Sequence, residues 1–513
     1  MEQNFAKSLV KVNEGFLKGY EERGLHVFKG VPYAAPPVGE LRFRQPADHG
    51  EWRGVRNAAN YAAASIQATH MLDIFPDAVN GQYEEDCLYL NIWSPAKTSE
   101  EKLPVYFWIH GGGLVAGSGN EPVCDGFNLA QKQNIIVVTI NYRLGFFGFF
   151  AHPDLRAEND HASAGNYAFW DMRKAAMWIK RNIAAFGGDP DNITIAGQSG
   201  GSMAVGALFA SPEMKGIARN MVMESGPMYW IVMPIKTREE IDENARSFMN
   251  LAGCSTIDEL RKKDAWELYD IILRNKLVMN FNYCADGWFL PKPVIDIMDE
   301  GSFNDCNLMI GCTSQEFWLT RRDGMPISEY EGYLQKHFPD DWEQILEWYP
   351  ASTPQEAGKQ LATLGSDFMV VSCAKAGQTL RKYGKNAYVF LVKKQTENDE
   401  GRLIGSPHCA EMPYIFGTED KGGSNPFADY KWQPSDYVFE ARMMGYWGNY
   451  ARSGNPNGAG LSVWPVYEND FDIMTLDNEC EALPASEYPK YAYLLDKLNK
   501  GEHPKMVPVF MGE

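Results

Sequence analysis

The stretch Asn192-Ile193-Thr194-Ile195-Ala196-Gly197-Gln198-Ser199-Gly200-Gly201 is the most informative part of this 513-residue chain. Its first half is rich in β-branched residues, which favour a β-strand. Its second half places a serine between glycines, and glycine lets the backbone turn where a side chain would collide. A strand-to-helix turn of this kind pushes the serine hydroxyl outward and suggests a nucleophile. The short pattern alone is weak evidence, because an ordinary Gly/Ser turn has the same letters.

Two further segments predict strands that are buried on both faces of a parallel sheet. Residues 104–109 and 135–140 are continuous apolar runs without alternation, as in strands covered by helices on both sides. Residues 166–186 carry apolar side chains at helical spacing, and Gly187-Gly188 follows as a stop signal. The order strand, strand, helix, strand, turn predicts an α/β fold with a doubly wound, mostly parallel sheet.

The middle of the chain, about residues 231–372, has a different pattern. It predicts amphipathic helices separated by polar turns, with few runs typical of buried strands. Strand character resumes at residues 386–392. We therefore expect one domain over residues 1–513, in which the helical block is a cap inserted into the sheet.

Composition and charge exclude several classes of protein. Apolar residues make up 45% of the chain and charged residues 22%, as in ordinary globular proteins. The 67 acidic and 48 basic residues give a net charge of −19, and no dense basic cluster could neutralise phosphates, so nucleic acid is not expected as a partner. No window holds eighteen uncharged apolar residues, and we expect no transmembrane segment.

The cysteines and the N-terminus bear on the cellular compartment. The nine cysteines are scattered singly without a C-x-x-C pair, which argues against a zinc module and a dense disulfide framework. The N-terminal residues lack the apolar core of a signal peptide. We expect a cytoplasmic protein, a monomer or small homo-oligomer, that uses no cofactor or metal.

A catalytic serine needs a base, an acid that orients the base, and donors for the oxyanion that forms. His110-Gly111-Gly112-Gly113 follows a predicted strand, and consecutive glycines allow neighbouring backbone N–H groups to point at one spot. This loop is the best candidate for an oxyanion hole; a flexible glycine loop is the alternative. A dinucleotide site at Gly117-Ser118-Gly119 is excluded because no third glycine follows at the required offset.

His408 is the best candidate for the base among the nine histidines. It follows a glycine and a proline in a turn after the late strands and lies far C-terminal to Ser199, where this chain order places the base. Glu316 follows a short apolar strand and is the first candidate for the acid. Asp305 and Glu411 remain open as alternatives.

Longer motifs along the chain are similar to those of a known family. They are Phe28-Lys29-Gly30-Val31-Pro32-Tyr33, Glu85-Asp86-Cys87-Leu88-Tyr89-Leu90-Asn91-Ile92, Asn141-Tyr142-Arg143-Leu144-Gly145, Phe186-Gly187-Gly188-Asp189-Pro190 and Gly454-Asn455-Pro456-Asn457. On these motifs the chain resembles the type-B carboxylesterases, the cholinesterase-like and para-nitrobenzyl-esterase-like family of the α/β-hydrolases, over nearly its whole length. The resemblance implies the α/β-hydrolase fold, with helices on both faces of the sheet.

The resemblance also implies roles for the candidate residues. They are Ser199 as nucleophile, Glu316 as acid, His408 as base, and the backbone N–H groups of Gly112, Gly113 and Gly200 as the oxyanion hole. Glu316 is thereby chosen over Asp305 and Glu411, and Glu411 becomes a structural neighbour of the base. The implied function is that of a serine carboxylesterase that hydrolyses small-molecule esters through an acyl-enzyme on Ser199.

Two alternatives to this function stay open. The same triad could serve lipase-like or amidase activity. A non-catalytic cholinesterase-like binding module is the other alternative, and the presence of serine, acid and histidine at the matching positions argues against it.

The chain departs from the family pattern on either side of the serine. Gln198 and Gly200 stand where the family usually has glutamate and alanine. A neutral amide near His408 removes a negative charge that would favour the imidazolium. We therefore expect His408 to be less basic than in a relative with glutamate at this position.

Two other departures concern the surroundings of the site. Secreted relatives pair the cysteine at the Cys87 position with an upstream cysteine, and this chain has none before Cys87. The loop from Ser65 to Cys87 is therefore expected to be free to move over the site entrance. Phe317-Trp318, beside the candidate acid, is expected to reshape the pocket wall.

Overall fold

The structure is a computed structural model that describes residues 7–68, 81–226, 228–229, 236–317, 322, 324–397, 403–419 and 430–502. Its centre is an 11-stranded sheet. In spatial order the strands are β18 (Glu481–Ala482), β17 (Ile473–Leu476), β14 (Ala387–Val392), β13 (Asn307–Thr313), β12 (Asn220–Glu224), β11 (Gly188–Gln198), β9 (Leu103–Ile109), β10 (Ile136–Ile140), β8 (Tyr89–Ser94), β4 (Leu25–Pro32) and β3 (Tyr20–Glu22).

The inner part of the sheet is parallel. The pairs from β17 through β14, β13, β12, β11 and β9 to β10 are all parallel, whereas β18, β8, β4 and β3 join antiparallel at the two edges. The predicted strands around residues 104–109, 135–140 and 193–196 are neighbours in this parallel region, as β9, β10 and β11. The prediction of a doubly wound, mostly parallel sheet is confirmed.

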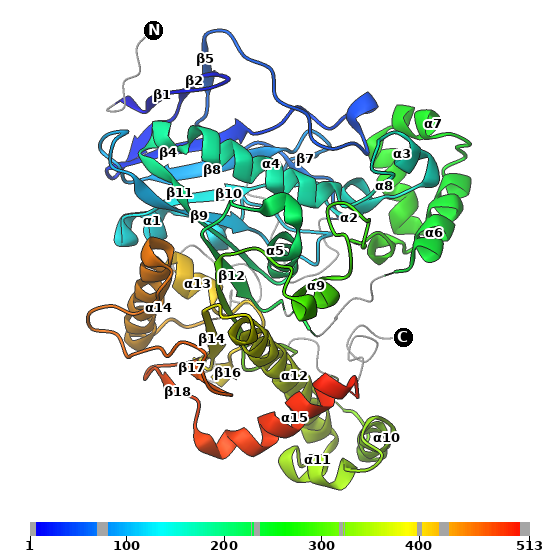
Figure 1. The fold of residues 1–513 in the computed structure, drawn as a ribbon, viewed down its shortest axis with the longest axis vertical. Helices are drawn as coiled ribbons and strands as arrows, with labels where there is room; N and C mark the ends of the chain where they lie inside the picture. The colour runs from blue at the N-terminus through cyan, green and yellow to red at the C-terminus, as the bar shows by residue number, and fades with distance from the viewer. Residues whose placement is uncertain are drawn as a thin grey trace.

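Successive residues of β9 enter two separate apolar cores. Val105, Phe107 and Ile109 belong to the core under α4 (Tyr167–Asn182), α5 (Gly200–Ala210) and α12 (Pro354–Lys382). Tyr106 and Trp108 belong to the core under α1 (Phe127–Gln133), α13 (Met412–Phe416) and α14 (Pro434–Ser453). Because helices cover both faces, the strand needs apolar residues on both sides, and this explains its unbroken apolar run. Figure 1 shows α1, α13 and α14 on one side of the sheet and α4 and α5 on the other.

The predicted helix at residues 166–186 is also confirmed. It is observed as α4 followed by a 3₁₀ turn over Ile183–Phe186. Gly187 ends it with a φ of 84°, a left-handed conformation that suits glycine.

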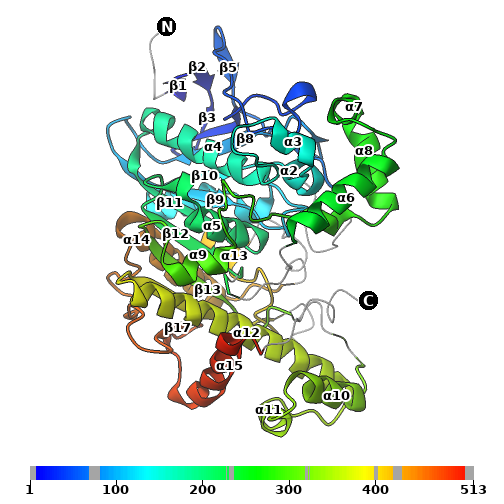
Figure 2. The same cartoon turned by 45° about the vertical axis from the view of Figure 1, so that its right-hand side comes forward.

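Helices between residues 236 and 382 form two groups rather than one block. The first group is α6 (Arg238–Leu251), α7 (Ile257–Lys262), α8 (Ala265–Arg274) and α9 (Val294–Glu300), and the second is α10 (Ile327–His337), α11 (Trp342–Trp348) and the long α12. The strand β13 separates them and lies within the central sheet. Figures 1 and 2 show α6–α8 at one end of the molecule and α10–α11 at the other. The helical region expected at about residues 231–372 is therefore interrupted by a sheet strand.

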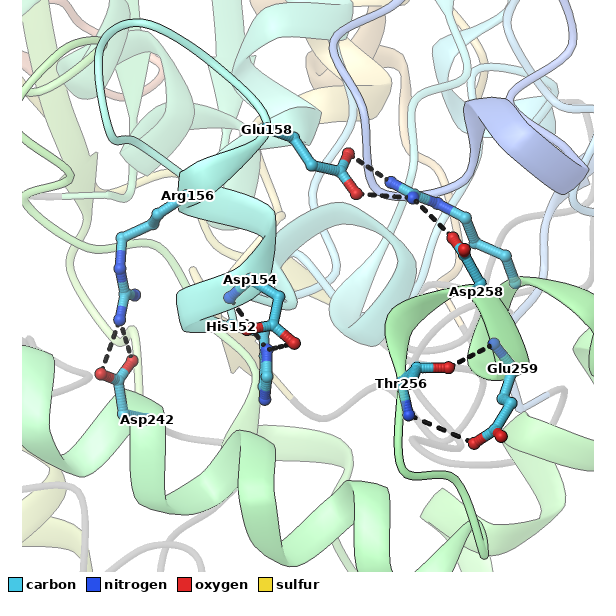
Figure 3. A network of polar contacts seen from close by, with 9 residues as sticks. His152, Asp154, Arg156, Glu158, Asp242, Thr256, Asp258 and Glu259 are labelled. Carbon is cyan, nitrogen blue, oxygen red and sulfur yellow. Dashed lines mark hydrogen bonds and ion pairs between the residues drawn. The ribbon is translucent and has the colours of Figure 1, made fainter.

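The lobe formed by α6, α7 and α8 is attached to the body through paired charges (Figure 3). Arg156, on α3 (Pro153–Ala157), donates to both carboxylate oxygens of Asp242 at 2.5 and 2.6 Å. Arg156 uses a single nitrogen for both bonds, whereas Arg261 of α7 donates through Nη1 and Nη2 to the two oxygens of Glu158, at 2.7 and 2.8 Å. The two-pronged Arg261–Glu158 pair fixes orientation as well as distance, so the lobe is held in one position on the body.

The remaining elements are short or peripheral. They are α2 (Gly145–Phe149), α15 (Tyr488–Lys500), the sheet of β1 (Leu9–Val12), β2 (Gly15–Lys18) and β5 (Val55–Asn57), and the strand pairs β6 (Ala64–Ser65) with β7 (Tyr83–Glu84) and β15 (Thr396–Glu397) with β16 (Leu403–Gly405). None of the helices in the described ranges combines the length and apolar character of a membrane span.

Candidate active site

Ser199 stands at the sharp turn between β11 and α5. Its backbone has a φ of 55° and a ψ of −122°, a region that costs a non-glycine residue about 1–3 kcal/mol. The Ser199 N–H donates to Glu224 O at 2.8 Å, and Ser199 O accepts from Met203 N at 3.0 Å. These bonds to β12 and to the first turn of α5 hold the strained conformation, and the side chain remains half-buried at the carboxyl edge of the sheet.

The glycines around Ser199 are required by close backbone contacts. A Cβ added at Gly197 would lie 2.6 Å from the Gly201 carbonyl group, and one at Gly201 would lie 2.7 Å from His110 O. Such distances are shorter than carbon atoms tolerate. An ordinary Gly/Ser turn at the surface would have room for side chains, so it does not explain this packing.

The glycine loop that follows β9 packs directly against the elbow. Gly112 and Gly113 have φ values of 97° and 61°. A Cβ added at Gly200 would lie 2.7 Å from the backbone nitrogen of Gly113, and one added at Gly111 would lie 3.2 Å from Ser199 Cβ. The structure therefore brings the loop and the first turn of α5 together beside Ser199, where backbone N–H groups can surround a developing oxyanion.

His408 and Glu316 come together from two loops at the same edge of the sheet. The loops pair through a bridge between Gln315 and Pro407, with Gln315 N donating to Ser406 O at 3.1 Å. His408 Nδ1 donates to Glu316 Oε2. Glu316 Oε1 is also occupied, because it accepts from the backbone N–H of Thr313 at 2.7 Å.

The contact between Glu316 and His408 shifts the pKa of each group toward its charged form. Burial raises the pKa of Glu316, but His408 together with hydrogen bonds from Ser225 and Thr313 outweighs burial, so the pKa lies below its usual value. Burial lowers the pKa of His408, but Cys409 and the Glu316 carboxylate raise it, so the pKa lies well above its usual value. Glu316 is thus an anion that orients the imidazole and stabilises its protonated form.

The other imidazole nitrogen faces Gln198. Gln198 Nε2 lies 3.3 Å from His408 Nε2, so in the neutral imidazole, with its proton on Nδ1, Nε2 is the acceptor. Within the described ranges, no hydrogen bond joins Ser199 Oγ to His408. Gln198, the residue before Ser199, thus brings the elbow next to the imidazole.

Two buried carboxyl groups, Glu224 and Glu411, lie near the pair. The sequence pointed to Glu411 but not to Glu224. Glu411 Oε1 accepts from Ser225 Oγ at 3.3 Å, and burial together with the Glu316 carboxylate raises the pKa of Glu411 to about 7. Burial and Glu411 raise the pKa of Glu224 well above its usual value. Glu411 is thus a buried neighbour of the pair, whereas Asp305 lies at the surface and pairs with Lys385 at 2.6 Å.

The segment from Ser65 to Cys87 is tied at both ends. β6 pairs with β7 through Ala64 with Tyr83 and Ser65 with Glu84, and the buried Cys87 thiol interacts with the Ser65 hydroxyl. All nine cysteines lie in the described ranges and are free. Residues 69–80, the centre of the loop expected to be mobile, lie outside the described residues, as does Trp318. In the ranges that are described, no group of His, Cys, Asp and Glu is arranged to hold a metal ion.

The chain is similar in sequence to known proteins over most of its length. Residues 6–491 match the Carboxylesterase family. The chain is 32% identical to the medium-chain fatty acyl-CoA hydrolase precursor of Anas platyrhynchos over 91% of this chain and 88% of that protein. It is 31% identical to the liver carboxylesterase of Sus scrofa over 92% and 89%.

Solved structures are similar over nearly their full length. A PNB esterase has a TM-score of 0.80 and 29% identity, covering 94% of this chain and 99% of that one. A Geobacillus stearothermophilus carboxylesterase has a TM-score of 0.80 and 28% identity, covering 95% and 100%.

Proposed function

The chain belongs to the carboxylesterase family and is a carboxylic ester hydrolase, and from this premise we propose that Ser199, Glu316 and His408 are its catalytic triad. The observation that carries the proposal is the Glu316–His408 hydrogen bond at the sheet edge that also holds the strained Ser199. An anionic acid, an oriented imidazole and an outward serine are the parts that nucleophilic ester hydrolysis requires.

In the proposed acylation step, His408 Nε2 removes the proton of Ser199 Oγ as that oxygen attacks the ester carbonyl carbon. The carbonyl oxygen becomes an oxyanion, which accepts hydrogen bonds from the backbone N–H groups of Gly112, Gly113 and Gly200. The C–O bond to the alcohol then breaks, and His408 donates its proton to the departing alkoxide. Glu316 stabilises the imidazolium between these two proton transfers.

Deacylation repeats the same steps with water. His408 takes a proton from the water molecule as its oxygen attacks the acyl-enzyme carbonyl. The Ser199 ester bond breaks, the proton returns to Ser199, and the carboxylic acid leaves.

The natural substrate is proposed only as a class, small-molecule esters. Lipase-like and amidase activities remain alternatives on the same triad. A panel of p-nitrophenyl esters from acetate to palmitate, assayed beside an aryl amide, separates them. Preference for the longest chains would favour a lipase, and amide turnover comparable with ester turnover would favour an amidase.

We also propose a cytoplasmic location, because nine buried free cysteines suit a reducing compartment. Cell fractionation of the native protein tests this location. Sedimentation analysis tests the proposed monomer or small homo-oligomer.

The decisive experiment for the mechanism is Ser199→Ala. The substitution removes the nucleophile, and kcat for p-nitrophenyl butyrate is expected to fall about 10⁶-fold. Labelling by a fluorophosphonate probe is expected to disappear, while the exposed Ser462→Ala control keeps both activity and labelling. Wild-type turnover by Ser199→Ala would overturn the proposal and favour another nucleophile, whereas absent turnover and labelling in the unaltered protein would favour the non-catalytic binding module.

A further inference from the structure

A segment of chain lies beside the loop that continues from the glycine triplet to Gly117. The segment, residues 62–67, is held there by side chains from two loops at the sheet edge. Asn120 Nδ2 donates to Ala62 O at 2.9 Å, and Asn141 Nδ2 donates to Ala63 O at 3.0 Å. The segment is therefore positioned before any contact with substrate is made.

Gln67, in this segment, binds both backbone groups of Gly117, which lies four residues after Gly113 in the same loop. Its Oε1 accepts from Gly117 N at 2.7 Å, and its Nε2 donates to Gly117 O at 2.9 Å. The same Nε2 donates to Ser65 O at 3.1 Å. The side chain is only 6% exposed, so water cannot easily replace these bonds if the amide is removed.

Gly117 lies directly against the residues proposed to form the oxyanion hole. Its φ is 97°, and an added Cβ would lie 2.6 Å from Gly111 O and 2.6 Å from His110 Nδ1. A Cβ added at Gly112 would in turn lie 3.2 Å from Gly117 N. A displacement of Gly117 would therefore displace Gly111 and Gly112.

The residue after Gln67 is held as well. Ala68 N donates to the hydroxyl of Tyr269 on α8 at 2.9 Å. This helix belongs to the lobe that Arg261 fixes to Glu158, and Figure 3 labels Glu158 at this attachment. Gln67 is therefore supported from the loop side and from the lobe side.

We propose that Gln67 is a positioning residue for ester hydrolysis, which holds Gly117 so that the N–H groups of Gly112 and Gly113 meet the oxyanion. The proposal rests on the proposed function of Ser199 and its glycine loop. Gln67 touches no reacting atom and acts only through the backbone. Oxyanion stabilisation depends on donors that are in place before the reaction, so a small shift of the loop lowers the rate more than substrate binding.

The test is Gln67→Ala, with Gln67→Met as a second variant that keeps most of the side-chain volume. We expect kcat for p-nitrophenyl butyrate, per fluorophosphonate-titrated site, to fall about 10- to 100-fold, because a shift of about 1 Å has effects of this size. KM is expected to change less than about twofold. Affinity for a trifluoromethyl ketone, which forms an oxyanion on the serine, is expected to fall by the same factor as kcat, while inhibition by the matching methyl ketone stays unchanged.

The chain offers a matched control in Asn457. Its amide holds both backbone groups of Trp464 at the same two distances, 2.7 and 2.9 Å, in a distant loop. Asn457→Ala is expected to lower the melting temperature without changing kcat or ketone affinity.

Three results separate the possibilities. If both Gln67 variants lower the melting temperature but keep wild-type kcat and ketone affinity, as Asn457→Ala does, Gln67 is only structural and the proposal is overturned. If Gln67→Ala does not fold, Gln67→Met decides by the same criteria. If Ser199→Ala remains active, the proposed function itself fails, whatever Gln67 does.

Discussion

The two halves of the candidate site are held in different ways. The nucleophile half is built from backbone, because Ser199 and the glycine loop are fixed by main-chain hydrogen bonds and by contacts that leave no room for a Cβ. The acid–base half is built from side chains, because Glu316 and His408 form a buried ion pair and Ser225 donates a further hydrogen bond to Glu316. We expect added atoms in the nucleophile half, and changed charges in the acid–base half, to lower kcat.

Among substitutions that keep Ser199, the largest effect on kcat should come from removing the charge that orients the base. Glu316→Gln keeps the shape of the acid but removes its negative charge, and kcat is expected to fall about 10⁴-fold, as for amide replacement of a triad carboxylate. Without the carboxylate the imidazolium is less favoured, so the pKa of His408 falls and the acidic limb of the pH–kcat/KM profile moves to lower pH. Asp305→Asn, at the surface, is the control and should leave both unchanged. A nearly active Glu316→Gln would reassign the acid.

The next effect tests added atoms in the nucleophile half. The methyl group of Gly200→Ala would lie 2.7 Å from Gly113 N, and displacement of one oxyanion donor is expected to lower kcat by roughly 10²- to 10³-fold. Gly332→Ala adds the same methyl group on α10, where nothing lies within 4 Å, and should be fully active. Full activity in Gly200→Ala would mean that the loop moves aside without loss of the oxyanion donors.

A smaller effect, on the pH dependence of the rate, is expected at Gln198, where the two halves meet. Gln198→Glu would place a carboxylate beside His408 Nε2 and favour the imidazolium, so the pKa of His408 rises. Because the base must be neutral, the acidic limb of the pH–rate profile is expected to move to higher pH, by about one unit. Gln131→Glu, at an exposed position, serves as the charge control. An acidic limb at the same pH in both variants would contradict this contact.

The smallest effect on rate should come from the buried carboxyl behind the pair. The pKa of Glu411 rises from 4.5 to about 7 on folding, so the folded protein keeps a proton that the unfolded chain releases. This contribution to stability is present below pH 4.5 and is lost as the pH rises to about 7, with a slope of about 1.4 kcal/mol per pH unit. Glu411→Gln should remove this slope from the free energy of unfolding measured by denaturant between pH 5 and 7. An unchanged slope would show that Glu411 is ionised in the folded protein.

The comparison of the two halves also explains what could be predicted from sequence. The backbone half can be predicted from local sequence. A strand, a turn and a helix follow from the apolar run and from Gly197, Gly200 and Gly201, without reference to distant residues. The choice of Glu316 over Asp305 needed the resemblance to a family, because loop position alone left several carboxylates open.

Other features could not be predicted because they depend on contacts between distant parts of the chain. Gln67 lies 50 residues from Gly117, and the amide–backbone bonds between them leave no local pattern. Glu224 gave no signal, since it ends an apolar strand and its partner Trp447 is 223 residues away. The short apolar strand before Glu316 was expected, but nothing local showed that this strand, β13, lies inside the central sheet and divides the helical region.

The sequence by itself determined the parallel core, the strained serine turn and the membership of a hydrolase family, because hydrophobic runs, glycine conformations and ordered motifs are properties of neighbouring residues. The tertiary structure added the contacts themselves: Glu316 bonds Nδ1 of His408, Gln198 lies on the other nitrogen, and Gln67 holds Gly117. The reason is physical: a side chain's charge state and hydrogen-bond partner depend on which distant segments bury it, and folding alone brings those segments together.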